Sequence, residues 1–144
     1  MPTHAEKRTL AYTPEQMFDL VADVERYPEF LPWCTAVRIH HRKGNEIMSD
    51  MVIGFKMFRE KFTTRVLLHP SRRIDVEYTN GPFKYLNNHW IFEPAPDGGC
   101  TVDFYIKFEF KSKILQSAIG LVFNEAVQKM ISAFESRAKS IYTP

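Results

Sequence analysis

The chain has 144 residues, enough for one domain with a sizeable core and too few for two independent cores. Its 44% hydrophobic and 25% charged residues and net charge of +2 argue against disordered, collagen-like and membrane-spanning classes and against a DNA partner. Cys34 and Cys100 are too few for a disulfide framework, and the N-terminus lacks a signal peptide, so we predict a cytoplasmic protein without a metal site or cofactor.

A short N-terminal strand is followed by a predicted helix that begins at Pro14. Thr13 and Gln16 match a capping box, and proline suits the first position of a helix. Apolar residues then recur at helical spacing until Pro28 and Pro32 limit the helix. We therefore expect a short, broken helix pair that ends in an aromatic-rich connector.

From Val37 to about Lys111 apolar and polar residues alternate, and clusters of Gly, Pro, Asn and Asp interrupt the alternation. This pattern predicts about six antiparallel strands that share one buried face. The alternation is clearest in the last strand, where five apolar residues point to one side. These are Val102, Phe104, Ile106, Phe108 and Phe110.

From about Ser112 to Tyr142 the apolar residues advance by three or four positions, which predicts a long amphipathic helix. Gly120 inside it suggests a bend or the close approach of another group. Sheet and helix must each bury one apolar face, so the economical fold is α+β, with a curved antiparallel sheet wrapped around the C-terminal helix. If curvature keeps the two faces apart, a cavity results.

The segment from Phe55 to Arg59 connects two predicted strands without Gly, Pro or Asn. Because it mixes apolar and basic residues, its tip could enter an anionic bilayer, with Met57 and Phe58 as the membrane contacts. The alternative is one continuous bulged strand in which Phe55 and Phe58 pack inward.

Catalytic sequence motifs of hydrolases, metalloproteases, nucleotide-binding proteins and thiol oxidoreductases do not occur in the sequence. An enzyme would need a positioned acid and base in the cavity, and strand parity supplies only Tyr78 and Cys100 as inward ionisable groups. Cys34 fits a small buried hydrophobic residue better than a nucleophile. We therefore predict that the protein is not an enzyme.

Three segments carry a resemblance to a known family. They are the string YPEFLPWC over residues 27–34, the block GPFKYL over residues 81–86 with Trp90 and Phe92 behind it, and Phe108 to Phe110. In these motifs the chain resembles the coenzyme Q-binding, polyketide cyclase-like branch of the START superfamily, which also includes a bacterial ribosome-association toxin. The resemblance spans nearly the whole chain and implies a helix-grip fold.

The resemblance implies a single START-like lipid-binding domain over residues 1–144. Its expected function is to bind ubiquinone or a similar prenylated lipid as a carrier or chaperone for respiratory electron transport, in transient contact with the inner membrane surface. The alternative is a toxin-like protein that binds the large ribosomal subunit and blocks subunit association. The C-terminal helix region has five basic against two acidic residues, which fits a solvated face, RNA or anionic lipid equally well.

The apolar face and the family motifs together give the predicted ligand-binding residues: Phe30, Trp33, Phe62, Thr64, Tyr78, Phe83, Asn88, Trp90, Phe92, Phe104, Phe108, Ile119, Phe123 and Val127. Among them Asn88, Tyr78 and Thr64 could address quinone carbonyl oxygens, or they could satisfy backbone atoms instead. Aromatic residues at strand spacing are also compatible with a filled core.

Overall fold

The computed structural model describes residues 3–31, 33–55, 58–70 and 72–142, with only the backbone of Phe55 and Phe58. Its elements, in chain order, are β1 (Thr3–Leu10), α1 (Pro14–Ala22), the 3-10 helix η1 (Val24–Glu29), β2 (Cys34–Lys43), β3 (Glu46–Phe55), β4 (Phe58–His69), β5 (Arg73–Asn80), β6 (Phe83–Pro94), β7 (Cys100–Phe110) and α2 (Lys113–Tyr142).

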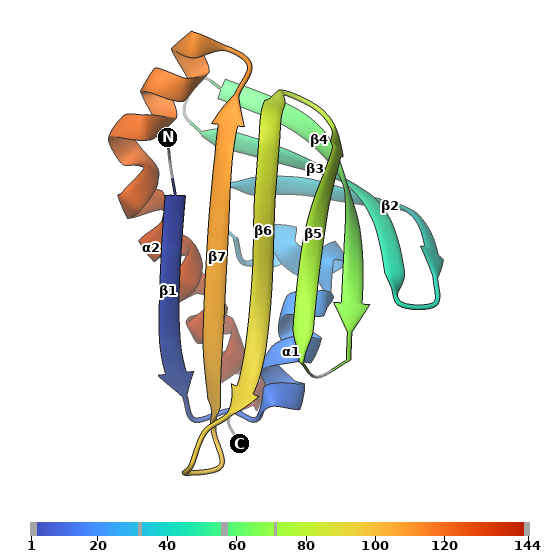
Figure 1. Cartoon of the computed structure of the whole chain (residues 1–144), viewed down its shortest axis with the longest axis vertical. Coiled ribbons are helices and arrows are strands. Elements are labelled where there is room, and N and C mark those ends of the chain that lie inside the picture. The colour runs from blue at the N-terminus through green and yellow to red at the C-terminus, as the bar shows by residue number, and fades with distance from the viewer. Residues whose placement is uncertain (1–2, 32, 56–57, 71, 143–144) are drawn as a thin grey trace.

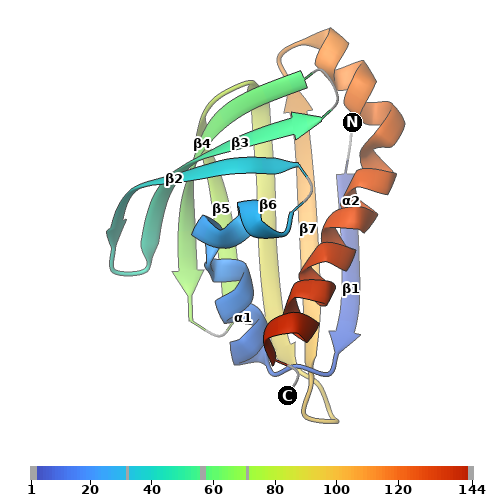
Figure 2. The same cartoon turned by 180° about the vertical axis from the view of Figure 1, so that it is seen from behind.

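The seven strands form one antiparallel sheet in the order β1-β7-β6-β5-β4-β3-β2. The sheet is strongly curved, and α2 lies across its concave side (Figure 1). Seen from behind, α1 and η1 cover the same side of the sheet (Figure 2). The predicted α+β helix-grip fold, with its meander of strands and its helix pair after the first strand, is confirmed. No described helix has the length and hydrophobicity needed to cross a membrane.

The capping box at the start of α1 is present. The Thr13 hydroxyl accepts a hydrogen bond from the Gln16 backbone N–H at 3.1 Å, and the Gln16 side chain accepts one from the Thr13 N–H at 2.9 Å. Two N–H groups that lack partners within the helix are thereby satisfied. Pro28 lies inside η1, which keeps this second helix short and of the 3-10 type.

Bulges and one glycine shape the curvature of the sheet. The register shifts at extra residues in β2, β5 and β6, and such bulges bend a strand and increase its twist. At the β5–β6 turn, Gly81 has a φ of +147°, and a Cβ there would lie 2.6 Å from the Cβ of Phe62. Only glycine therefore allows this turn to press against β4.

The hairpin between β3 and β4 tests one of the two interpretations of the Phe55–Arg59 segment, the continuous strand. Phe55 pairs with Phe58 in antiparallel register, so the chain reverses direction here. The continuous bulged strand is therefore wrong. Met57 and the side chain of Phe58, the predicted membrane contacts, lie outside the described residues.

The two halves of α2 are packed differently. In the C-terminal half Ile131, Phe134 and Ala138 are buried in the larger of two hydrophobic clusters. The smaller cluster receives only Leu115 as a buried residue of the N-terminal half. On the outer side of that half, Ile114 and Leu121 are 75% and 88% exposed. The N-terminal half therefore has apolar residues on both of its sides.

Gly120 tests whether the N-terminal half of α2 needs a glycine. The residue is exposed, and a Cβ there would meet no atom within 4 Å, so the expected close approach is wrong. We predict that Gly120→Ala raises the free energy of unfolding by about 1 kcal/mol, because alanine favours a helix interior over glycine by that amount. Urea unfolding followed by circular dichroism measures the change. A less stable variant would show that this position requires a conformation other than regular helix.

Candidate functional site: an apolar cavity under the C-terminal helix

A cavity of about 250 Å³ lies between the concave face of the sheet and α2. The sheet contributes aromatic side chains such as Trp90, Phe104 and Phe108, and α2 contributes Ile119 and Phe123. Its walls include members of both hydrophobic clusters. The cavity therefore occupies the space that the poorly packed half of α2 leaves open, and a filled core does not describe this region.

Most of the predicted ligand-binding residues line this cavity. They are Trp33, Phe62, Thr64, Phe83, Asn88, Trp90, Phe104, Phe108, Ile119, Phe123 and Val127. Strand alternation and helical spacing predict most of them, because each pattern identifies the face that an element turns inward. Trp33 and Phe83 come from the segments that carry the family resemblance.

Phe30, Phe92 and Tyr78 lie outside the cavity walls, contrary to prediction. The Phe30 ring packs on Phe134 with centroids 5.2 Å apart, and Phe92 meets Phe18 edge-on at 5.8 Å. The Tyr78 hydroxyl accepts a hydrogen bond from the Phe83 N–H at 3.0 Å. Strand parity predicts the face of Phe92 and Tyr78 but not whether a helix or turn covers that face. Phe30 follows η1, and its prediction came from the family motif.

The cavity walls contain few polar groups. The Asn88 amide nitrogen donates a hydrogen bond to the Tyr105 backbone carbonyl at 2.9 Å. For this nitrogen, the alternative of a bond to the backbone is therefore confirmed. Thr64 pairs with the hydroxyl of Ser49 at 3.5 Å. The predicted trio of Asn88, Tyr78 and Thr64 does not converge, because Tyr78 is directed to the β5–β6 turn.

Four polar lining residues were not among the predicted ligand-binding residues: Tyr27, Cys34, Ser49 and Glu60. Glu60 shares the strand parity of Phe62 and Thr64, so alternation along β4 could have identified it. The parity of Ser49 was obscured because β3 also carries polar residues on its outer face. Among the residues that the structure describes, Glu60 is the one charged side chain in the cavity lining.

The two thiols are poor candidates for chemistry. Cys34 lines the cavity, and burial raises its pKa to about 11. Burial likewise raises the pKa of Cys100 to about 11. Both groups are therefore protonated thiols near neutral pH, whereas thiol nucleophiles react as thiolates.

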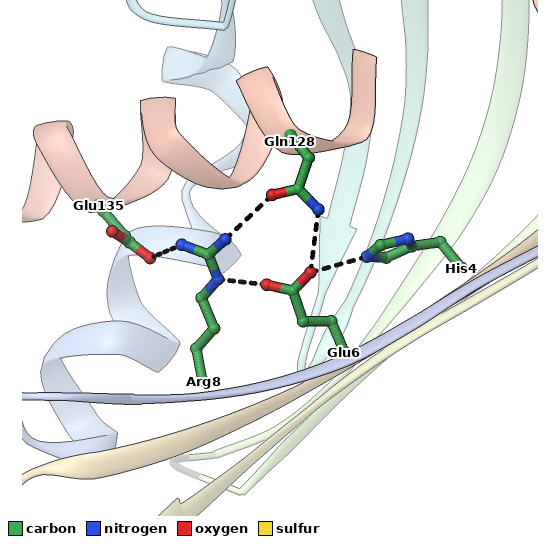
Figure 3. Close-up of polar contacts among 5 residues, drawn as sticks. All are labelled: His4, Glu6, Arg8, Gln128 and Glu135. Atoms are coloured by element: carbon green, nitrogen blue, oxygen red, sulfur yellow. Dashed lines mark hydrogen bonds and ion pairs between the residues drawn. The ribbon is translucent and has the colours of Figure 1, made fainter. Parts of the chain in front are cut away.

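A polar network attaches α2 to the edge strand β1 beside the cavity (Figure 3). Glu6 binds Arg8 and accepts hydrogen bonds from His4 at 2.9 Å and from Gln128 of α2 at 3.2 Å. Arg8 also donates to the side chains of Gln128, at 3.1 Å, and Glu135. The inward face of β1 is thus polar, and it holds α2 by directional contacts.

Further contacts hold the C-terminal half of α2. Arg137 donates to Glu29 of η1 at 2.8 Å, and the Tyr142 hydroxyl donates to the Gln16 carbonyl of α1 at 2.8 Å. The N-terminal end of α2 makes hydrogen bonds with residues only a few positions away along the chain. One of them is a hydrogen bond from the Phe110 N–H, at the end of β7, to the Gln116 side chain at 2.8 Å. The helix is therefore fixed mainly beyond the cavity.

Comparison with known proteins assigns this fold to a family. Residues 10–135 match the family described as polyketide cyclase / dehydrase and lipid transport. The chain belongs to this family, and the resemblance to START-type proteins is confirmed.

The chain is similar to proteins with two kinds of names. It is 41% identical to the "Ribosome association toxin RatA" of Rickettsia prowazekii, over 93% of this chain and 94% of that protein. It is 32% identical to the mitochondrial "Coenzyme Q-binding protein COQ10 homolog B" of Xenopus laevis, over 96% of this chain and 59% of that protein. The solution structure of an 18 kDa protein from Caulobacter crescentus covers the whole chain with 39% identity and a TM-score of 0.80.

The network around Glu6 predicts an acid-dependent loss of stability. Burial alone would raise the pKa of Glu6, but hydrogen bonds from Arg8, His4 and Gln128 outweigh it and hold the pKa below 4.5. A carboxyl group with a lowered pKa stabilises the folded state above its unfolded-state pKa, and this contribution is lost as the pH falls through the folded-state value.

We predict that Glu6→Gln lowers the free energy of unfolding by about 1 kcal/mol at pH 7, since charged hydrogen bonds are replaced by neutral ones. Below about pH 4.5 the wild type should lose this advantage, so the two stability curves converge. Urea unfolding from pH 3 to pH 7 measures both curves. Parallel curves would contradict a stabilising role of the Glu6 carboxylate.

Proposed function

We propose that the chain is a non-enzymatic carrier or chaperone that encloses ubiquinone or a similar prenylated lipid and supports respiratory electron transport. It would act as a single START-like domain over residues 1–144. The observation that supports this function best is the apolar cavity between the sheet and α2. Similarity to a protein named for coenzyme Q binding adds to it.

The cavity suits a ring with an isoprenoid tail. Aromatic walls such as Trp90, Phe104 and Phe108 can stack on or meet the edges of a ligand ring. Each tail CH₂ that leaves water contributes about 0.8 kcal/mol, so a few isoprene units give useful affinity without a strong polar anchor. The volume of about 250 Å³ lies just below the usual range for small-molecule pockets. A long tail would therefore extend beyond the cavity or displace α2.

A carrier function also agrees with the poor chemistry of the cavity. General acid–base catalysis needs a positioned donor and acceptor pair, and within the described lining no histidine, lysine or second carboxylate accompanies Glu60. The buried thiol of Cys34 is protonated near neutral pH because burial raises its pKa to about 11. Both observations support binding without turnover.

A lipid carrier must approach a membrane, and the outer side of the N-terminal half of α2 has suitable residues. Ile114 and Leu121 are exposed, and Lys111 and Lys113 are exposed beside them. Apolar residues flanked by cations favour the surface of an anionic bilayer. The same half of α2 covers the cavity, so contact there would bring the membrane close to the ligand site.

Filling the cavity tests the carrier function directly. Ala126 of α2 lines the cavity, and we expect Ala126→Phe to abolish stoichiometric co-purification of quinone from a ubiquinone-producing host. Ser132→Phe is the matched control, because it adds the same side chain at an exposed position of α2. Native mass spectrometry with lipid extraction measures bound quinone.

If wild-type protein neither co-purifies with quinone nor takes up added quinone, the carrier function is refuted. Bound quinone that survives in Ala126→Phe as it does in Ser132→Phe would place the ligand elsewhere on the protein.

The second candidate function is binding to the large ribosomal subunit with a block of subunit association. Relatives named as ribosome association toxins match this chain over more than nine-tenths of both lengths. The outer face of the edge strand β2 also carries three exposed basic or titratable residues, Arg38, His41 and Lys43. Such a row fits an anionic surface such as ribosomal RNA.

The outer face of β2 and the helix α2 both offer cations for contact with RNA. Two of the cations on α2 are engaged in ion pairs, Lys129 with Glu125 and Arg137 with Glu29. Within the described part of the chain, Arg38 and Lys43 of β2 have no ion-pair partner, and neither have Lys113 and Lys139 of α2. The basic excess of the C-terminal helix region therefore overstates the charge that α2 offers to a partner.

Charge reversal on β2 tests the ribosome function. We expect Arg38→Glu/Lys43→Glu to weaken co-sedimentation with isolated large subunits about tenfold or more and to reduce its dependence on salt, because two contacts to phosphate are lost. The control Lys7→Glu/Arg72→Glu makes the same change in net charge at exposed positions away from β2. Equal binding by both variants would contradict a role for the β2 face.

A further inference from the structure

The described lining of the cavity has one acidic residue and no basic residue. Glu60 is its one charged lining residue, and no Lys, Arg or His belongs to the described lining. The uncharged polar side chains in the walls include Ser49, Thr64 and Asn88, together with the thiol of Cys34 and the hydroxyl of Tyr27, which donates to the Val21 carbonyl. The amide nitrogen of Asn88 already donates to a backbone carbonyl.

Glu60 and the two hydroxyls lie at different depths. Glu60 is two residues from the start of β4, near the β3–β4 hairpin, and it is half-buried. Thr64 is four residues farther along β4, a distance of about 13 Å. Thr64 and Ser49 are 3% and 1% exposed, so the hydroxyl pair belongs to the enclosed part of the cavity.

The hydroxyl pair has unused hydrogen-bonding capacity. The two oxygens are 3.5 Å apart, at the long limit of a hydrogen bond, and no other hydrogen bond of either side chain occurs among the described residues. One O–H can donate within the pair, so the second O–H and several lone pairs are available to a ligand. A carbonyl or hydroxyl oxygen on the ligand would complete the pair.

An anionic lipid would be disfavoured in either orientation. With its headgroup inward, the anion would lose its hydration without a cation to replace it. With its headgroup toward the hairpin, it would lie near the Glu60 carboxylate, which repels it. An uncharged lipid with its headgroup inward meets neither problem and can bond to the hydroxyl pair.

We infer that the cavity takes uncharged lipids and rejects anionic ones, and that Ser49 and Thr64 form the subsite for the oxygen of the ligand headgroup. This inference rests on the proposed function of binding a lipid in the cavity. It adds that the lipid binds with its headgroup inward and its tail toward the β3–β4 hairpin. It also assigns the preference for uncharged lipids to Ser49, Thr64 and Glu60.

A competition assay separates the inference from the function on which it rests. Diphenylhexatriene, a hydrocarbon that fluoresces in apolar surroundings, serves as the probe. Dodecanol and dodecanoate at pH 8 serve as competitors that differ in headgroup charge. We expect dodecanol to displace the probe at a concentration at least about tenfold lower than dodecanoate, because the cavity offers the anion no cationic partner.

Two sets of variants test the assigned residues. Ser49→Ala/Thr64→Val should weaken dodecanol binding about fivefold to twentyfold and leave probe binding unchanged, because the hydrocarbon probe has no oxygen. Glu60→Gln should reduce the ratio of the dodecanoate and dodecanol concentrations that displace the probe several-fold. The control Glu77→Gln removes an exposed carboxylate from β5 and should leave the difference as it is in the wild type.

Each outcome has a distinct meaning. Failure of the wild type to bind the probe would refute the proposed function itself. Probe binding with equal competition by dodecanol and dodecanoate would overturn the selection against anions. A double variant that binds the probe and dodecanol as the wild type does would overturn the subsite, and circular dichroism verifies that each variant is folded.

Discussion

The rest of the structure depends on one mismatch, because the concave face of the curved sheet is wider than a single helix can cover. The C-terminal half of α2 is fixed by buried Phe134 and Ala138 and by polar contacts to β1, η1 and α1. The N-terminal half continues across the sheet with little buried surface of its own. The cavity is the space that remains, and it exists because the helix is held mainly at one end.

The sequence pattern was sufficient for the fold and for most of the cavity wall. Alternation along the strands and three-to-four spacing along α2 placed Trp90, Phe104 and Phe123 on inward faces, where the structure has them. The pattern failed where an element other than the sheet and α2 covers an inward side chain. Phe92 points inward but is covered by Phe18 of α1, and no local periodicity contains that contact.

Polar residues were harder to predict than apolar ones for a physical reason. An inward Ser or Glu interrupts the apolar alternation, so it resembles a residue of the outer face. Ser49 and Glu60 were missed in this way, although Phe62 and Thr64, which share the inward face of β4 with Glu60, were predicted. These exceptions to the pattern are also the groups that can distinguish one lipid from another, since apolar walls accept any hydrocarbon chain.

The two candidate functions use opposite faces of the same sheet. Ser49 faces the cavity, whereas its neighbour Asp50 lies on the outer face, opposite Arg38 in the β2–β3 register. Because successive residues of a strand point to opposite sides, a lipid in the cavity and an anionic partner on β2 do not compete for the same atoms. The fold therefore permits relatives to differ in function by changing one face while they keep the other, and the two activities can be tested independently in this chain.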